Sequence, residues 1–118
     1  MHELSIAQAV VRETEKRLRE AGVRPESARV IRVAVGDLSG ADAEALEEAF
    51  GALLATTALS GARAEVRRDP ARVVCPSCGI VDAHTPFRLA CPKCGGDPER
   101  IEGGRDITVE SVEVDDDG

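Results

Sequence analysis

Residues 75–79 and 91–95 read Cys75-Pro-Ser-Cys78-Gly79 and Cys91-Pro-Lys-Cys94-Gly95, two copies of one motif that hold all four cysteines of the chain. Thiolates separated by two residues on a tight turn can present two sulfurs to one ion at about 2.3 Å, and two such turns complete a tetrahedral shell. Proline fixes one backbone dihedral of each turn, and the glycine allows the positive φ with which the chain leaves it. The pattern predicts a structural zinc site formed by Cys75, Cys78, Cys91 and Cys94 within an inserted segment, residues 71–104.

Other uses of paired cysteines are a rubredoxin-like iron, an iron–sulfur cluster, a thioredoxin-type redox pair and a dithiol switch. A redox pair needs its motif beside a βαβ unit and a helix N-terminus, and we expect these motifs in a loop-rich insertion. A disulfide framework requires an oxidising compartment, for which the sequence carries no signal. We therefore favour zinc and expect a cytoplasmic protein. His84 is an alternative ligand, although it is typical of an exposed loop residue.

The charge of the chain excludes nucleic acid and anionic membranes as main partners. Lys and Arg total 15 against 22 Asp and Glu, which gives a net charge of −7. The cysteine segment, residues 71–104, is neutral, with 4 basic and 4 acidic residues, whereas a nucleic-acid-binding ribbon should be basic. No apolar run approaches the roughly 20 residues that span a membrane, and the N-terminus does not resemble a signal peptide.

The residues before the cysteines predict two helices and two strands. Apolar residues at helical spacing indicate a helix over 4–21, which Gly22 and Pro25 end. A run rich in β-branched residues predicts a strand over 28–36 that is covered on both faces. Asp42 is placed to cap a second helix over 43–59, in which Gly51 costs about 1 kcal/mol unless close packing requires it. Alternation predicts a short strand over 62–67.

After the cysteines, residues 107–114 predict a third strand with a bulge near Ser111, because the apolar positions change from odd to even. A strand, a helix and a strand in series favour a parallel crossover. The third strand returns from the insertion and should run antiparallel to the second. We therefore expect an α+β fold, in which a small mixed three-stranded sheet is covered by two helices and carries an inserted zinc-ribbon-like subdomain with four cysteine ligands. The larger domain comprises residues 1–70 plus 105–118, and residues 71–104 form the insertion.

A second metal site is suggested by His2, one of two histidines in the chain. The α-amine of Met1, the following amide nitrogen and the imidazole can form fused five- and six-membered chelate rings. A planar set of nitrogens suits Ni(II) or Cu(II). The amide nitrogen or the carboxylate of Glu3 can fill the fourth position. A histidine at position 2 can equally be an exposed residue that binds no metal.

Three groups of residues resemble the HypA/HybF family of nickel metallochaperones for [NiFe]-hydrogenase maturation. They are the opening Met1-His2-Glu3-Leu4-Ser5-Ile6-Ala7, the run Val35-Gly36-Asp37-Leu38-Ser39-Gly40 leading into Glu44-Ala45-Leu46, and the paired cysteine motifs followed by 107–114. The resemblance implies nickel binding at Met1, His2 and Glu3, and structural zinc at the four cysteines. It also implies Ni(II) as transported cargo and a nickel-binding role for the larger domain.

The same resemblance implies a HypB-type GTPase and the [NiFe]-hydrogenase large subunit as partners, and it is compatible with a homodimer. Asp42 matches a family position near nickel, but its capping role also accounts for it. No histidine adjoins either cysteine motif, which argues against pH-driven zinc rearrangement. No catalytic triad, phosphate loop or paired carboxylates are present, so we expect a protein that is not an enzyme. The alternative is a zinc-ribbon adaptor or regulatory protein without labile metal.

Overall fold

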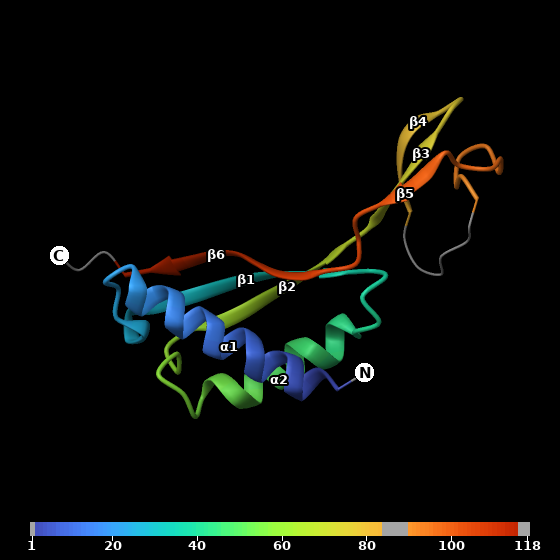
Figure 1. Cartoon of the computed structure of the whole chain (residues 1–118). Coiled ribbons are helices and arrows are strands. Elements are labelled where there is room, and N and C mark those ends of the chain that lie inside the picture. The colour runs from blue at the N-terminus through green and yellow to red at the C-terminus, as the bar shows by residue number, and fades with distance from the viewer. Residues whose placement is uncertain (1, 84–89, 116–118) are drawn as a thin grey trace.

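The computed structural model describes residues 2–83 and 90–115, which form two three-stranded sheets and two helices (Figure 1). The sheets have the strand orders β2-β1-β6 and β4-β3-β5. Both helices lie on one face of the first sheet, and the second sheet projects from its end, so the molecule measures 53 × 29 × 17 Å. The elements are α1 (Glu3–Glu20), η1 (Pro25–Ser27), β1 (Ala28–Gly36), α2 (Ala43–Leu54), β2 (Arg63–Asp69), β3 (Ala71–Cys75), β4 (Gly79–Ala83), β5 (Arg100–Glu102) and β6 (Ile107–Val114).

Strand β1 is the centre of the larger sheet and is buried on both faces, as its composition predicts. Ile31, Val33 and Val35 pack against the helices, where Leu46 and Phe50 of α2 complete the core. The strand pairs in parallel with β2 and antiparallel with β6. The parallel crossover is therefore confirmed, and β6 runs antiparallel to β2 from the far side of β1.

The predicted bulge lies in β6 at Glu110. Ser111 is opposite Arg32 while Val109 is opposite Val33, so one extra residue stands between them. The bulge keeps Ile107, Val109 and Val112 packed on the same core although their spacing changes from even to odd steps.

Helix α2 is shorter than the sequence predicts. It begins as expected, because the Asp42 carboxylate accepts a hydrogen bond from the Ala45 amide at 3.1 Å. It ends at Leu54 rather than at residue 59. The hydroxyls of Thr56 and Thr57 donate to the carbonyls of Leu53 and Leu54, and these local bonds compete with further helical turns.

The sheet face opposite the helices carries ion pairs between neighbouring strands. Arg32 of β1 contacts Glu65 of β2 at 3.3 Å and Glu113 of β6. Arg67 holds Glu110 through two hydrogen bonds of 2.8 and 2.7 Å and lowers the pKa of that carboxyl. Neither α1 nor α2 covers this face, so the aliphatic stems of such side chains shield the buried residues of β1 there.

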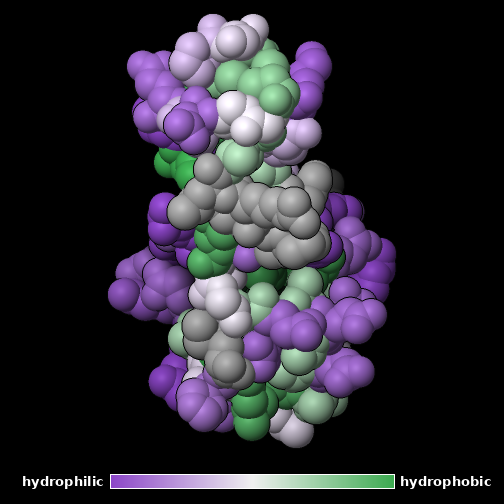
Figure 2. Space-filling model, turned by 90° about the vertical axis from the view of Figure 1, so that its right-hand side faces the viewer, coloured by the Kyte–Doolittle hydropathy of each residue, from purple (hydrophilic) through white to green (hydrophobic). Residues whose placement is uncertain are grey.

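The smaller sheet was not predicted. Residues 71–104 were expected to be loop-rich, but β3 pairs antiparallel with both β4 and β5. Val73 of β3 is completely buried and packs in one cluster with Cys75 and Cys91. Ile80 of β4 is 69% exposed. Figure 2 shows hydrophobic side chains among hydrophilic ones at the upper end of the molecule. A core this small needs further stabilisation.

The two sheets meet at a joint formed by residues 36–38, 69–71 and 103–106. The amides of Gly36, Asp37 and Leu38 donate to the carbonyls of Asp106, Asp69 and Gly104 at 2.8, 2.9 and 2.6 Å. The Asp37 carboxylate, 4% exposed, accepts a hydrogen bond from Arg68 at 2.9 Å. A Cβ on Gly36 would lie 2.2 Å from the Gly104 oxygen, so the approach of these backbones requires glycine.

We therefore expect Gly36→Ala to lower the free energy of unfolding by about 1–3 kcal/mol, because the added methyl group forces the joint apart. Urea titration followed by circular dichroism measures the change. The matched control is Gly51→Ala in α2, where no atom lies within 4 Å of the added Cβ. Equal stability of Gly36→Ala and the unsubstituted protein would show that the joint is not tightly packed.

Candidate metal centres

The structure brings the four cysteines together at one end of the smaller sheet. Cys75 ends β3 and Cys78 precedes β4, while Cys91 and Cys94 lie in the turn before β5. All four sulfurs lie within 4.8 Å of one another, and none forms a disulfide. The Cys75 and Cys94 sulfurs are 3.6 Å apart, and ideal tetrahedral zinc thiolates are separated by about 3.8 Å. The donor set and its spacing therefore fit a tetrahedral ion.

The local backbone holds the cysteine turns as their glycines predict. Gly79 and Gly95 have φ values of +79° and +75°. The Gly95 amide donates to the Cys91 carbonyl at 2.8 Å, and the Gly96 amide donates to the Cys94 sulfur at 3.4 Å. Such N–H donors orient a thiolate and partly neutralise its charge.

The thiols differ in their tendency to ionise. Backbone N–H groups of Cys94 and Lys93 lower the pKa of Cys91 to about 7. Burial, together with hydrogen bonds to the neighbouring sulfurs, raises the pKa of Cys78 to about 12. Four thiolates this close repel one another, so a divalent cation is the natural partner of the fully deprotonated set.

At the other predicted centre, Glu3 is the first residue of helix α1 and His2 precedes it, while Met1 lies outside the described residues. His2 is exposed and stands just before the helix, where its carbonyl accepts a hydrogen bond from the Ile6 amide at 3.2 Å. Its imidazole is therefore accessible to an ion in solution. His84 also lies outside the described residues.

Glu3 makes a contact that the sequence analysis missed. Its carboxylate accepts a hydrogen bond from the backbone amide of Asp42 at 3.0 Å, and this bond lowers the pKa of Glu3. The two residues are 39 positions apart, so no local pattern announces the pair. Glu3 is thus tied to the start of α2. Asp42 uses its own carboxylate on Ala45, which confirms its capping role.

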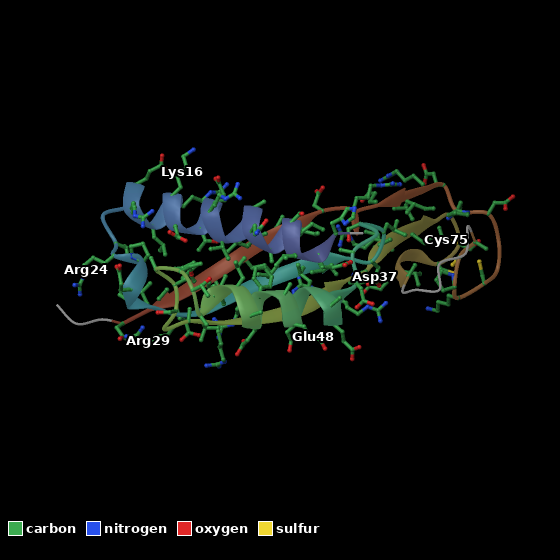
Figure 3. The ribbon with its side chains drawn as sticks, turned by 90° about the horizontal axis from the view of Figure 1, so that it is seen from below. Lys16, Arg24, Arg29, Asp37, Glu48 and Cys75 are labelled. Atoms are coloured by element: carbon green, nitrogen blue, oxygen red, sulfur yellow. The ribbon has the colours of Figure 1, made fainter. Side chains whose placement is uncertain are left out.

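A pocket of about 450 Å³ adjoins this contact, between the start of α2 and the joint. Asp42 and Glu44 line one side, and Asp37 and Arg68 line the other. Figure 3 shows Asp37 between α2 and the cysteine end of the molecule.

Within residues 2–83 and 90–115, the cysteines are the one cluster of at least three potential metal-ligating side chains. In the same residues, neither helix has the length and apolarity needed to cross a membrane.

Comparison with known proteins gives full-length matches. A family model described as "Hydrogenase/urease nickel incorporation, metallochaperone, hypA" matches residues 1–114. The hydrogenase maturation factor HypA of Geobacter metallireducens is 38% identical over 116 residues, which are 97% of this chain and 99% of the relative. That of Roseiflexus is 38% identical over 118 residues, 99% of this chain and 94% of the relative.

A solved structure has the same fold. The solution structure of the Ni metallochaperone HypA from Helicobacter pylori matches with a TM-score of 0.64 over 97% of each chain, at 18% sequence identity. That similarity supports the α+β architecture described above. Together with the family model and the full-length relatives, it shows that this chain belongs to the HypA family of nickel-incorporation metallochaperones.

Proposed function

We propose that the chain binds Ni(II) at its N-terminus and delivers it for maturation of [NiFe]-hydrogenase. Family membership supports this function, and relatives of similar length are named hydrogenase maturation factors. The observation that carries the proposal is the hydrogen bond from Asp42 to Glu3, because it ties Glu3 to the start of α2 while the preceding residue, His2, stays exposed.

The nickel ligands in this proposal are nitrogens of the first three residues. The α-amine of Met1, the His2 amide and the His2 imidazole form adjacent chelate rings of five and six members. The carboxylate of Glu3 is already bonded to Asp42, so its amide nitrogen is the better fourth ligand. That amide lies in the first turn of α1, where backbone N–H groups have no helical partner.

The four cysteines hold a structural zinc in this proposal. A shell closed by four protein sulfurs leaves no position for water or substrate, and such sites contribute folding free energy on the order of 10–16 kcal/mol. Residues 71–104 then form a zinc-binding domain inserted into a nickel-binding domain, residues 1–70 plus 105–118. The small buried cluster around Val73 supports this need for metal.

The protein acts in the cytoplasm as a carrier rather than as an enzyme, and its partners are a HypB-type GTPase and the hydrogenase large subunit. The family description also names urease, so a urease is a second candidate for the nickel. A homodimer is compatible with this function. The contrasting function, a zinc-ribbon adaptor without labile metal, requires the cysteine site but no nickel at His2.

We expect purified protein to contain one zinc ion per chain, and Cys91→Ala to lose it. Hydrogen exchange should then accelerate most strongly in 71–104 while the two helices keep most of their protection, because all four ligands lie in that segment. Elemental analysis measures the metal. Stoichiometric iron, or unchanged protection of 71–104 in a zinc-free variant, would contradict a structural zinc.

We expect His2→Ala to abolish specific Ni(II) binding and to leave the zinc content unchanged, because the planar nitrogen set and the tetrahedral sulfur set are separate sites. Isothermal titration with Ni(II) measures the change. His84→Ala, which removes the other histidine, is the matched control and should bind normally. Loss of both metals in His2→Ala would contradict two sites, and Ni(II) binding unaffected by His2→Ala would favour the adaptor.

Extending the chain by one glycine before Met1 should also abolish the Ni(II) site, because it moves the free amine out of the chelate. The fold and the zinc content should not change. The planar Ni(II) absorption band, compared between extended, unextended and C-terminally tagged proteins, measures the effect. Full-affinity binding by the extended protein would exclude the amine and leave the side chains of His2 and Glu3 as ligands.

A further inference from the structure

A groove of about 370 Å³ runs between helix α2 and strand β2, on elements that contribute no cysteine. Glu47, Gly51 and Leu54 of α2, with Ala55 just after the helix, line one wall. The other wall is lined by Ser60, Ala62, Arg63 and Ala64, and the Arg63 guanidinium is paired with Glu65 at 2.8 Å. Strand β2 is an edge of the larger sheet, because the strand order is β2-β1-β6. An edge strand presents backbone N–H and C=O groups to which another extended chain can pair.

The exposed surface of α2 carries uncompensated negative charge, and one of its three glutamates, Glu47, lines the groove. Glu44, Glu47 and Glu48 are exposed, and the helix contains no lysine or arginine. None of these three carboxylates takes part in an ion pair within the described residues, whereas the acidic residues on the open face of the sheet are paired with arginines. Figure 3 shows Glu48 on the side of α2 that faces away from α1.

Gly51 lies in this wall, and nothing in the fold requires a glycine at that position. Glycine in a helix interior is less favourable than alanine. No atom lies within 4 Å of a Cβ placed on Gly51, so packing in this chain does not exclude a side chain there. A missing Cβ at a groove wall allows a second backbone to approach closely.

We propose that the α2–β2 groove docks an extended, basic segment of a partner protein. The segment adds to the edge of β2, passes close to Gly51, and places lysine or arginine side chains against Glu47 and Glu48. A second copy of this chain is a poor occupant, because each copy carries a net charge of −7. The larger groove between α1 and β6 has no such preference, since Glu13 and Arg17 at its rim form an ion pair of 2.9 Å.

This proposal goes beyond nickel binding, and its test uses the zinc-loaded protein without nickel. The probe is a nine-residue peptide that alternates lysine with valine, titrated into ¹⁵N-labelled protein at low salt. We expect amide shifts concentrated in Glu47–Ala55 and Ala62–Arg68, and no comparable shifts from a peptide that alternates glutamate with valine. Shifts concentrated on α1 and β6, or equal binding of both peptides, would overturn the proposal.

Two variants test the contacts. Gly51→Ala should raise Tm by about 2–6 °C and weaken peptide binding about fivefold or more, because the methyl group fills the space that the segment needs. The double variant Glu47→Gln, Glu48→Gln should weaken binding about two- to tenfold, while Glu20→Gln, a change of an exposed carboxylate on α1, should have little effect. Unchanged binding by Gly51→Ala, or equal loss in Glu20→Gln, would overturn the proposed geometry.

Discussion

The backbones at Gly36 and Gly104 approach each other so closely that this contact fixes how the two sheets are joined. Three chain segments meet there: the end of β1, the passage from β2 to β3, and the return towards β6. A side chain on either glycine would separate them. Because β1 and β2 end at this joint, it also positions the loop that leads to Asp42, and through Asp42 the residue Glu3.

Most of the larger sheet could be predicted from the sequence, because its signals are local. The β-branched run at 28–36, the cap at Asp42 and the change of phase near Ser111 each identify an element by short-range spacing. The predicted end of α2 was wrong, because the hydroxyls of Thr56 and Thr57 bond to backbone carbonyls and the helix stops within an apolar run. The smaller sheet was missed because its strands have only 5, 5 and 3 residues, too few to show a clear alternation of apolar and polar positions.

The same distinction holds for the candidate metal centres. The cysteine turns are visible in the sequence, because each motif carries its own proline, glycine and ligands, and the sulfurs do converge. The bond between Glu3 and Asp42 joins residues 39 positions apart, which lie together because α1 packs beside α2. No spacing rule reports such a contact, so the support for the N-terminal residues is a property of the tertiary structure alone.

The insertion of the smaller sheet between β2 and β6 also has an entropic consequence. When residues 71–104 are folded, Ala71 and Gly104 lie against each other at the joint, and β6 reaches β1 directly. If that segment were disordered, β6 would have to close a long flexible loop, at an entropic cost of about 3 kcal/mol. An ordered insertion thus replaces a long flexible connection between β2 and β6 with a short one. It stabilises the larger sheet, to which the cysteines do not belong.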